Sequence, residues 1–474
     1  MRKTTAAEIA RLVSVAMPCR LVGDDRTVVG PDVVRDNREA TKESLFVALV
    51  GEKFDGHDFA SKAVEAGSSV ILSNRATDAD ATHVICPDTL VGLSGLARGL
   101  VAREIERGLT TFAITGSSGK TSTKDLLAQI LEHSASGNVV SPQGSYNNEI
   151  GVPLTACQVD EATQYFVAEM GADAKGDVAK LCQIVPPKIS MIINIGMAHL
   201  GKFGSREAIA EAKSEIFEAL PQDGWAVLNA DDDLISKMRP NANLAAFSIR
   251  ELPDYEIAVS VEDVECDDYD RYSFTLVTSV RGDIQRHPVK LKVLGKAQMI
   301  DAAAAATAAL AAGLAPEKIA EGLSIAEARS SWRMALTELS DDIAIINDAY
   351  NANPGSMAAA LNSLSGMGSR NGRQRRTIAI LGDMLELGDK SYDLHRNVGR
   401  MAAELGITKV YAVGEFASYI SEGVTKAGGS AEVADPAKIA EILELSAGDI
   451  ALVKASRGLA LEKVADRLTE RFSN

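Results

Sequence analysis

The sequence predicts an α/β protein of three domains, and three observations lead to that fold class. The 474 residues are enough for two to four domains, and a hydrophobic fraction of 46% is sufficient for ordinary globular cores. Short apolar runs alternate with helix-like patterns along the chain, which is typical of parallel sheets covered by helices. The alternation restarts at Leu109 and after about residue 325, so the domains are expected at 1–108, 109–325 and 326–474.

The first segment, residues 1–108, is expected to form a small α/β domain. Apolar runs at 44–49, 69–72 and 83–86 predict strands, and helical patterns occupy 58–66 and 90–105.

The second domain opens on a turn of small residues that connects an apolar run at 112–114 to a helix-like segment at 123–131. The turn is Thr115-Gly116-Ser117-Ser118-Gly119-Lys120-Thr121-Ser122. Small residues allow backbone N–H groups to face an anion, Lys120 can reach terminal phosphates, and the Thr121 hydroxyl can bind Mg²⁺. The turn therefore predicts a nucleoside triphosphate site. It matches a shortened P-loop, Gly-x-x-Gly-Lys-Thr, because Ile114 stands where the general pattern has Gly. A purely structural turn is the alternative.

The rest of this P-loop domain is predicted to be a mostly parallel sheet that ends in an antiparallel meander. Strand-like runs at 165–169, 189–195 and 225–228 alternate with helices, three alternating runs fill 257–293, and helix returns at 295–323.

The third domain has the pattern of a doubly wound, Rossmann-like sheet. Four apolar strands are expected at 343–347, 377–381, 409–413 and 449–453, with helices between them. The arginine-rich turn 370–376 has no interleaved aromatic residues, so a solvated loop is favoured over a nucleic-acid patch.

Composition narrows the class of protein. A net charge of −16 argues against non-specific binding to nucleic acid. Five scattered cysteines without a Cys-x-x-Cys pair favour reduced thiols and a cytoplasmic location. No signal core or apolar run long enough to insert into a membrane is visible.

Polar residues at the ends of predicted strands suggest a metal site beside the P-loop. Glu169 ends one strand and His199 follows another, and with Thr121 they form an oxygen and imidazole set suited to Mg²⁺.

Lys213 stands out because it falls on the apolar stripe of the helix expected at 206–220. Its helical neighbours are Ile209, Ala210, Ile216 and Phe217, whereas Glu207, Glu211, Glu215 and Glu218 lie on the other face. Its ammonium either extends to solvent or is buried, in which case its pKa is lowered.

Three polar loops follow strands of the third domain, at 348–354, 382–388 and 454–458, and Arg333 precedes the first strand. Together they suggest a cleft that faces the P-loop domain. No Gly-x-Gly-x-x-Gly after a strand, His-Glu-x-x-His or Gly-x-Ser-x-Gly is present, which argues against a dinucleotide enzyme and against zinc or serine hydrolases.

These motifs together resemble the Mur ligase family, the ATP-dependent amino-acid-adding enzymes of peptidoglycan precursor synthesis. The resemblance covers essentially the whole chain. It rests on the shortened P-loop and Lys213, and on the segments 146–151, 169–171, 194–200 and 228–232. Two further segments resemble motifs of the family branch that adds D-alanyl-D-alanine. They are Asp348 to Pro354, and Gly382 to Gly388 together with His395.

The resemblance implies a two-step ligase reaction in the cytoplasm. ATP phosphorylates the carboxylate of UDP-MurNAc-tripeptide, and the amine of D-Ala-D-Ala attacks the acyl phosphate to give the pentapeptide precursor. Lys120, Lys213, His199 and Glu169 would be catalytic, with Thr121, Glu169, His199 and a carbamylated Lys213 around Mg²⁺. A monomer is expected.

The same resemblance assigns the binding residues. ATP would contact Gly116, Ser117, Ser118, Gly119, Lys120, Thr121, Ser122, Asn148, Asp301, Arg333 and Asp348. The uridine end of the substrate would lie against Asp36, Asn37, Arg38, Phe46, Ala48, Gly56 and His57. The dipeptide cleft would hold Tyr350, Asn351, Asn353, Lys454 and Ser456.

One segment departs from the family pattern. Family members have His-Asn and, two residues further, Asn before the alanine-rich helix, whereas this chain has Ala297, Gln298 and Asp301 there. Two other functions stay open: a ligase of this fold that adds a different amine, such as a single amino acid or a variant dipeptide, and a non-catalytic nucleotide-binding module.

Overall fold

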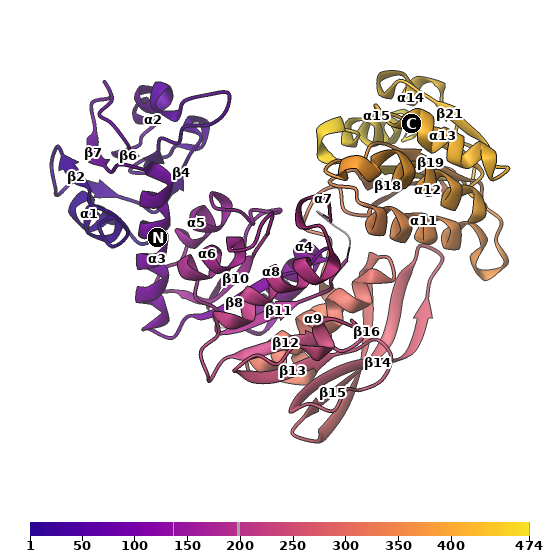
Figure 1. The fold of residues 1–474 in the computed structure, drawn as a ribbon, viewed down its shortest axis with the longest axis horizontal. Coiled ribbons are helices and arrows are strands. Elements are labelled where there is room, and N and C mark those ends of the chain that lie inside the picture. The colour runs from indigo at the N-terminus through magenta and orange to yellow at the C-terminus, as the bar shows by residue number, and fades with distance from the viewer. Residues whose placement is uncertain (136, 197–199, 474) are drawn as a thin grey trace.

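The computed structural model describes residues 1–135, 137–196 and 200–473, and within them the predicted α/β class is confirmed. Its three main sheets lie within residues 20–85, 110–294 and 335–454. Figure 1 shows the first domain and the third domain standing apart on either side of the central one. The expected boundaries at 108 and 325 stay predictions.

The first domain is a five-stranded sheet in the order β2-β7-β6-β5-β4, parallel except for β2. Its strands and helices are β2 (Arg20–Val22), β4 (Val33–Val34), β5 (Leu45–Val47), β6 (Val70–Ser73), β7 (Thr82–Ile85), α1 (Ala6–Val13), α2 (Ala60–Glu65) and α3 (Thr89–Ile105), with a small ribbon of β1 (Thr4–Thr5) and β3 (Val28–Val29). The apolar residues of α3 join the core of this domain to that of the central domain.

The central domain is a nine-stranded sheet in the order β16-β15-β14-β13-β12-β11-β8-β10-β9. Seven of these strands pair in parallel: β8 (Thr110–Thr115), β9 (Asn138–Val140), β10 (Thr163–Glu169), β11 (Ile189–Ile192), β12 (Trp225–Asn229), β13 (Asn243–Phe247) and β14 (Ile257–Cys266). The last two, β15 (Arg271–Val280) and β16 (Asp283–Leu294), each pair antiparallel with the strand before them. The predicted meander is therefore part of the same sheet, because β13 pairs with β12 on one side and with β14 on the other.

Helices cover both faces of the central sheet. One face carries α4 (Lys120–Ser134), α9 (Ala297–Ala311) and α10 (Pro316–Ile325), and the other carries α5 (Gly151–Ala156), α6 (Asp177–Ile184) and α8 (Arg206–Glu218). A short helix, α7 (Leu200–Phe203), precedes α8. Parallel strands end at the same edge, so the loops after β8, β10 and β11 meet there.

The third domain is a six-stranded doubly wound sheet in the order β17-β18-β22-β19-β20-β21, antiparallel only at β17. Its elements are β17 (Ala335–Glu338), β18 (Ala344–Asp348), β19 (Thr377–Leu381), β20 (Lys409–Ala412), β21 (Ala431–Val433), β22 (Ile450–Lys454), α11 (Pro354–Ser369), α12 (Ser391–Glu404), α13 (Ala417–Lys426), α14 (Pro436–Ile442) and α15 (Glu462–Phe472). In the described part of the chain, no helix is long and apolar enough to span a membrane.

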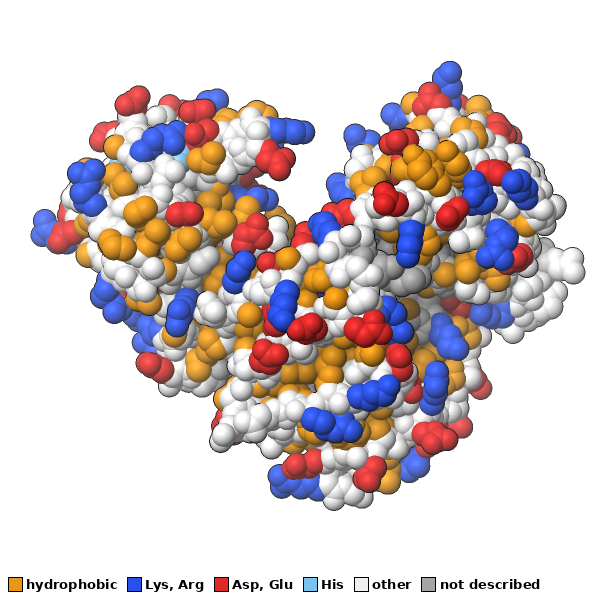
Figure 2. Space-filling model, in the orientation of Figure 1, with side chains coloured by type: hydrophobic (Ala, Val, Ile, Leu, Met, Phe, Trp, Pro, Cys, Tyr) orange, Lys and Arg blue, Asp and Glu red, His pale blue; other side chains and the backbone are white. Residues whose placement is uncertain are grey.

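The arginine-rich turn 370–376 is largely exposed, as the sequence favoured, but two of its arginines also bind the central domain. Arg370 donates to Asp270 of the central domain at 2.8 Å, and Arg373 pairs with Asp268 at 3.1 Å. The turn fixes the third domain to the hairpin between β14 and β15. Figure 2 shows the open hollow between the first and third domains.

Candidate active site

The small-residue turn lies between β8 and α4, as the sequence predicted. Gly119 has φ of +81°, in the region that favours glycine, and no side chain caps the first turn of α4. The first N–H groups of this helix are therefore available to an anion, and the helix dipole favours negative charge at the same point.

The turn is held in shape by the segment that follows β11. Ser118 N–H donates to Asn194 Oδ1 at 3.0 Å, and Asn194 Nδ2 donates back to the Ser118 carbonyl at 3.2 Å. Gly196 N–H donates to Ser117 Oγ at 2.9 Å. These contacts preorganise the loop. Asn194 therefore belongs to the site, although in the sequence it stands out only as part of the segment 194–200.

Thr121 and Glu169 meet at the floor of the site. Thr121 Oγ1 donates to Glu169 Oε2 at 2.8 Å, and Glu169 is only 1% exposed. Asn147 Nδ2 donates to the other carboxylate oxygen at 2.7 Å. Lys120 Nζ bonds to the Gly116 carbonyl at 2.9 Å, and burial lowers its pKa.

The oxygens of Thr121 and Glu169 are of the type that Mg²⁺ prefers. Among the described residues no group of three or more His, Cys, Asp or Glu side chains could hold a metal by itself. The set fits Mg²⁺, which takes few protein ligands and completes its shell with phosphates and water. His199, expected beside them, lies outside the described residues.

Lys213 of α8 is buried, with 4% of its surface exposed. Burial and the positive charge of Lys120 lower its pKa to about 7. None of the described residues accepts a hydrogen bond from it or pairs with its ammonium. Of its two expected states, the structure therefore shows the buried one.

Glu215 does not lie on the exposed acidic face that the sequence predicted for α8. It is buried, and its carboxylate accepts N–H bonds from Gly176 at 2.7 Å and Ala179 at 3.1 Å. It thus serves the N-terminus of α6, where a carboxylate is favoured by the dipole.

Arg333 connects the third domain to this site. Its guanidinium donates to Ser145 Oγ at 2.6 Å and stacks on the ring of Tyr350 at 4.2 Å. Ser145 Oγ is also 2.7 Å from Thr121 Oγ1. Ser145 lies in the site and is a residue that sequence reasoning missed, because no motif singles out this serine.

Asp348 and Lys454 form a buried pair at the strand ends of the third domain. Lys454 Nζ donates to Asp348 Oδ2 at 2.6 Å, and Met334 N–H donates to Asp348 Oδ1 at 3.1 Å. The pair fixes the chain next to Arg333.

Several expected contact residues have structural bonds instead of open side chains. Asn353 caps α11 through Ser356 N–H at 2.9 Å, and Asn148 accepts from Gly151 N–H at 2.9 Å at the start of α5. Ser456 Oγ accepts from Leu385 N–H at 3.0 Å, whereas Asn351 is exposed.

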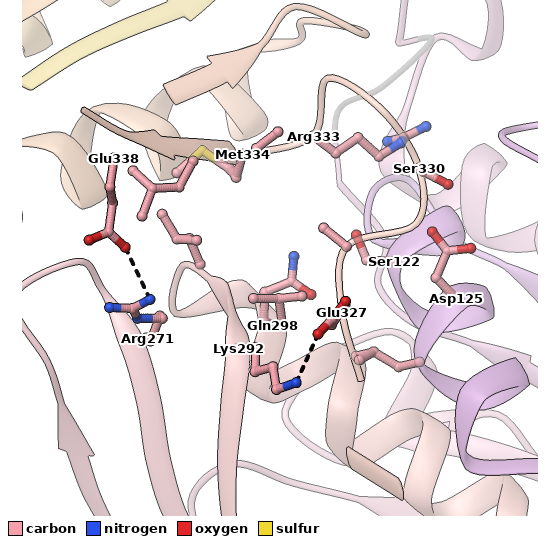
Figure 3. A pocket seen from close by; sticks show the side chains of 16 residues that line it. Ser122, Asp125, Arg271, Lys292, Gln298, Glu327, Ser330, Arg333, Met334 and Glu338 are labelled. Atoms are coloured by element: carbon pink, nitrogen blue, oxygen red, sulfur yellow. Dashed lines mark hydrogen bonds and ion pairs between the residues drawn. The ribbon is translucent and has the colours of Figure 1, made fainter. Parts of the chain in front are cut away.

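A cavity of about 200 Å³ opens beside the start of α4, between the central and third domains. Figure 3 shows Gln298, Ser330 and Arg333 around it, with Ser122 and Asp125 of α4 on one side. Gln298 Oε1, Ser330 Oγ and Arg333 Nε are buried atoms without a hydrogen-bond partner in the described part of the chain. Such atoms are uncommon in folded proteins, so their grouping around one cavity indicates a polar ligand.

A larger groove of about 630 Å³ lies on the other side of Asp125 and Ser330. It runs between the loop 141–144 and the residues Trp332 and Tyr350. Tyr350 is thus the dipeptide-cleft residue whose side chain faces an open space.

The expected uridine contacts fall into two groups. Asp36 pairs with Arg38 at 2.5 Å at the start of a short turn that includes Asn37, and His57 Nδ1 lies 2.6 Å from Asp55 Oδ1 beside Gly56. Phe46 and Ala48 are 0% exposed and belong to the core. Only their backbone remains to contact a ligand.

Known proteins resemble this chain over its length. The Mur ligase middle domain matches residues 114–309, and the Mur ligase, glutamate ligase domain matches residues 332–457. The chain is 38% identical to a UDP-N-acetylmuramoyl-tripeptide–D-alanyl-D-alanine ligase of Mycobacterium bovis, with 99% of this chain and 98% of that protein covered.

Two solved structures share the fold. MurF from Acinetobacter baumannii has a TM-score of 0.85 at 30% identity and 99% coverage of both chains. The MurF ligase from Thermotoga maritima in complex with ADP has a TM-score of 0.76 at 27% identity, covering 93% of this chain and 97% of that one. With these relatives and the P-loop site described above, the chain belongs to the Mur ligase family, in its MurF branch.

Proposed function

We propose that this protein is an ATP-dependent ligase that joins D-alanyl-D-alanine to UDP-N-acetylmuramoyl-tripeptide and releases ADP and phosphate. The observation that carries the proposal is the meeting of Lys120, the Thr121–Glu169 pair and Arg333 at one sheet edge, in a chain that matches ligases of this name over their full length.

Two features of the site support the proposed position of ATP. Its phosphates lie on the open N–H groups of α4, where Lys120 exchanges its bond to the Gly116 carbonyl for one to phosphate oxygen. Its nucleoside occupies the cavity of about 200 Å³, where Gln298, Ser330 and Arg333 offer unpaired polar atoms. The Thermotoga maritima relative was solved in complex with ADP, which supports nucleotide binding by this fold.

Mg²⁺ would be held by Thr121 and Glu169 together with the phosphates, with His199 as a further proposed ligand. When bound, the ion neutralises phosphate charge and so stabilises the phosphoryl transfer. Asn147 keeps the Glu169 carboxylate oriented by its bond of 2.7 Å.

Lys213 is proposed to carry a carbamate. A neutral amine is needed to add CO₂, and burial favours the neutral form because it lowers the pKa to about 7. The carbamate is an anion, so the repulsion between Lys213 and Lys120 is replaced by attraction. Its oxygens would also allow the side chain to bind a metal ion.

The reaction then follows from positioning. The tripeptide carboxylate attacks the terminal phosphorus of ATP, ADP leaves, and Lys120 offsets the charge that develops on the transferred group. The amine of the dipeptide attacks the acyl carbon, the C–O bond to phosphate breaks, and the amine loses a proton. Arg333 ties the third domain to Ser145, which keeps the reacting groups between two domains.

The first domain is proposed to bind the uridine end of the substrate through Asp36, Asn37, Arg38, Gly56 and His57, and through the backbone at Phe46 and Ala48. The groove beside Tyr350 is available to peptide, with Asn351, Asn353, Lys454 and Ser456 shaping the third-domain wall. We also propose a cytoplasmic monomer that binds no nucleic acid, in keeping with five free cysteines and the net charge of −16.

Phosphate release with ATP, UDP-MurNAc-tripeptide and D-Ala-D-Ala tests the proposal, with single amino acids as alternative amines. Release that requires both substrates is expected, and Lys120→Ala abolishes it. Release with another amine keeps the fold and changes the substrate. No release with any amine, although ATP binds, identifies a non-catalytic nucleotide-binding module.

A further inference from the structure

A carboxyl group lies buried directly behind the P-loop. Asp301, near the start of α9, is 3% exposed. Thr123 Oγ1 of α4 donates to Asp301 Oδ1 at 3.2 Å. A Cβ atom built on Gly119 would lie only 2.3 Å from the same oxygen. The carboxyl therefore touches the backbone of the residue that precedes Lys120.

The surroundings of Asp301 offer little compensation for a negative charge. The charged and titratable residues of the elements packed against α9 are Lys120, Lys124, Asp125, Glu132 and His133 on α4, Glu262, Asp263, Glu265 and Cys266 on β14, Arg271 and Tyr272 on β15, and Glu317, Lys318 and Glu321 on α10. Strands β11, β12 and β13 carry none, and Lys296 at the start of α9 is exposed.

The cations among these groups are engaged elsewhere. Lys124 pairs with Asp125 at 2.5 Å, and Arg271 pairs with Asp267 at 2.7 Å. Arg333, on the segment before β17, is the cation whose charge favours an ionised Asp301, but its bond is to Ser145. Within the described residues no cation lies within hydrogen-bonding distance of Asp301. Burial dominates and raises the pKa of Asp301 to about 8.

The nucleotide would bring its charge to the same short stretch of backbone. The N–H groups that follow Gly119 are the ones that face the phosphates, whereas Asp301 lies against Gly119 itself. An ionised Asp301 would place a buried anion beside a polyanion, in surroundings of low dielectric constant. A protonated Asp301 removes that repulsion and leaves the hydrogen bond from Thr123 in place.

We infer that nucleotide binding at the P-loop is coupled to proton uptake by Asp301, so that the affinity for ADP or ATP falls as Asp301 ionises. The inference rests on the proposed function, because it takes the P-loop as the nucleotide site. It makes Asp301 a positioning residue that sets the pH range in which the loop accepts phosphate.

The test is the dissociation constant of ADP with Mg²⁺, measured by calorimetry from pH 7 to 9. The phosphates of ADP are fully ionised over most of this range, since phosphate loses its second proton near pH of about 6. If only the protonated form binds, the constant scales as one plus the ratio of ionised to protonated Asp301, which predicts about tenfold weaker binding at pH 9 than at pH 7.

Asp301→Asn keeps the shape of the side chain and removes the ionisation. We expect its ADP affinity to change by less than about twofold over the same range, and to exceed that of the unmodified protein about tenfold at pH 9. Equal pH profiles for the two proteins would overturn the inference.

A second variant protects the test if Asp301→Asn folds poorly. Thr123→Val removes the hydrogen bond that favours the ionised carboxyl, so the loss of affinity moves to higher pH. Thr307→Val is the matched control on α9, because its buried hydroxyl bonds only to the Ala303 carbonyl at 2.7 Å and its profile stays in place. An unchanged profile for Thr123→Val would contradict the coupling.

The experiment separates the two ideas. ADP binding that does not depend on pH in the unmodified protein refutes the coupling and leaves the nucleotide site intact. Absence of ADP binding at pH 7 refutes the P-loop assignment and this inference with it.

Discussion

The contact between the central and third domains depends on the carboxylate of Asp270, and its removal has a calculable cost. Asp270 is 2% exposed and accepts from Arg370 at 2.8 Å, from Ser363 at 2.7 Å and from Tyr272 at 3.1 Å. Asp270→Ala removes the acceptor of two hydroxyls and the ion-pair partner of the guanidinium, which keeps its bond to the Asp267 carbonyl at 3.1 Å. Breaking a buried ion pair on one side costs about 3–5 kcal/mol, and because Arg370 is partly exposed we expect a loss of about 3 kcal/mol.

The assay is thermal unfolding of the whole chain by calorimetry. A loss of 1 kcal/mol lowers Tm by about 2–4 °C in a domain of this size. Asp270→Ala is therefore expected to lower the Tm of the transition in which the third domain unfolds by roughly 6–12 °C. Asp268→Ala is the control, because Asp268 pairs with the half-exposed Arg373 and is expected to contribute less than about 1 kcal/mol. Equal shifts for the two variants would refute the reasoning.

Three further predictions concern the site. Lys213→Ala is expected to abolish phosphate release and to regain part of it with added formate or acetate, and full activity without them would exclude a ligand role. Arg333→Lys should lower phosphate release at least about tenfold, because one ammonium cannot both reach Ser145 and stack on Tyr350. The control is Arg396→Lys in α12, where the arginine also contacts an aromatic ring, that of Tyr419, and phosphate release should stay within about twofold. Because the pKa of Asp301 is raised, the folded protein holds a proton that the unfolded chain releases above about pH 4, so the stability of the fold should decrease between about pH 4 and 8. Asp301→Asn should therefore raise Tm more at pH 9 than at pH 5. An equal effect at both pH values would contradict the burial argument.

The sequence predicted the parallel sheets of the second and third domains because their central strands are continuous apolar runs. The edge strands β2, β4, β9, β17 and β21 were missed, since strands of two to four residues with exposed faces carry no such run. The strand β13 was also missed, and with it the fact that the meander and the parallel sheet are continuous. Pairing between distant strands is a tertiary property that periodicity does not report.

The site was predictable where a local pattern carries the chemistry. The P-loop and the position of Lys213 on the apolar stripe of its helix follow from spacing alone, because small residues and a helical stripe are local signals. Spacing left open whether the Lys213 ammonium is buried or extends to solvent. The roles of Ser145, Glu215 and the turn at 370–376 were not predictable in this way. Each depends on partners that come from a different part of the chain: Thr121 and Arg333, the start of α6, and the acidic hairpin of the central domain.

The central claim is that one carboxylate of the tripeptide is activated by ATP at the P-loop and then captured by the dipeptide amine. The direct measurement uses UDP-MurNAc-tripeptide with ¹⁸O in that carboxylate, together with ATP and D-Ala-D-Ala, and mass spectrometry of the products. The account predicts one ¹⁸O atom in the released phosphate and a pentapeptide that retains the other. Unlabelled phosphate, or label that stays entirely in the peptide, would contradict it.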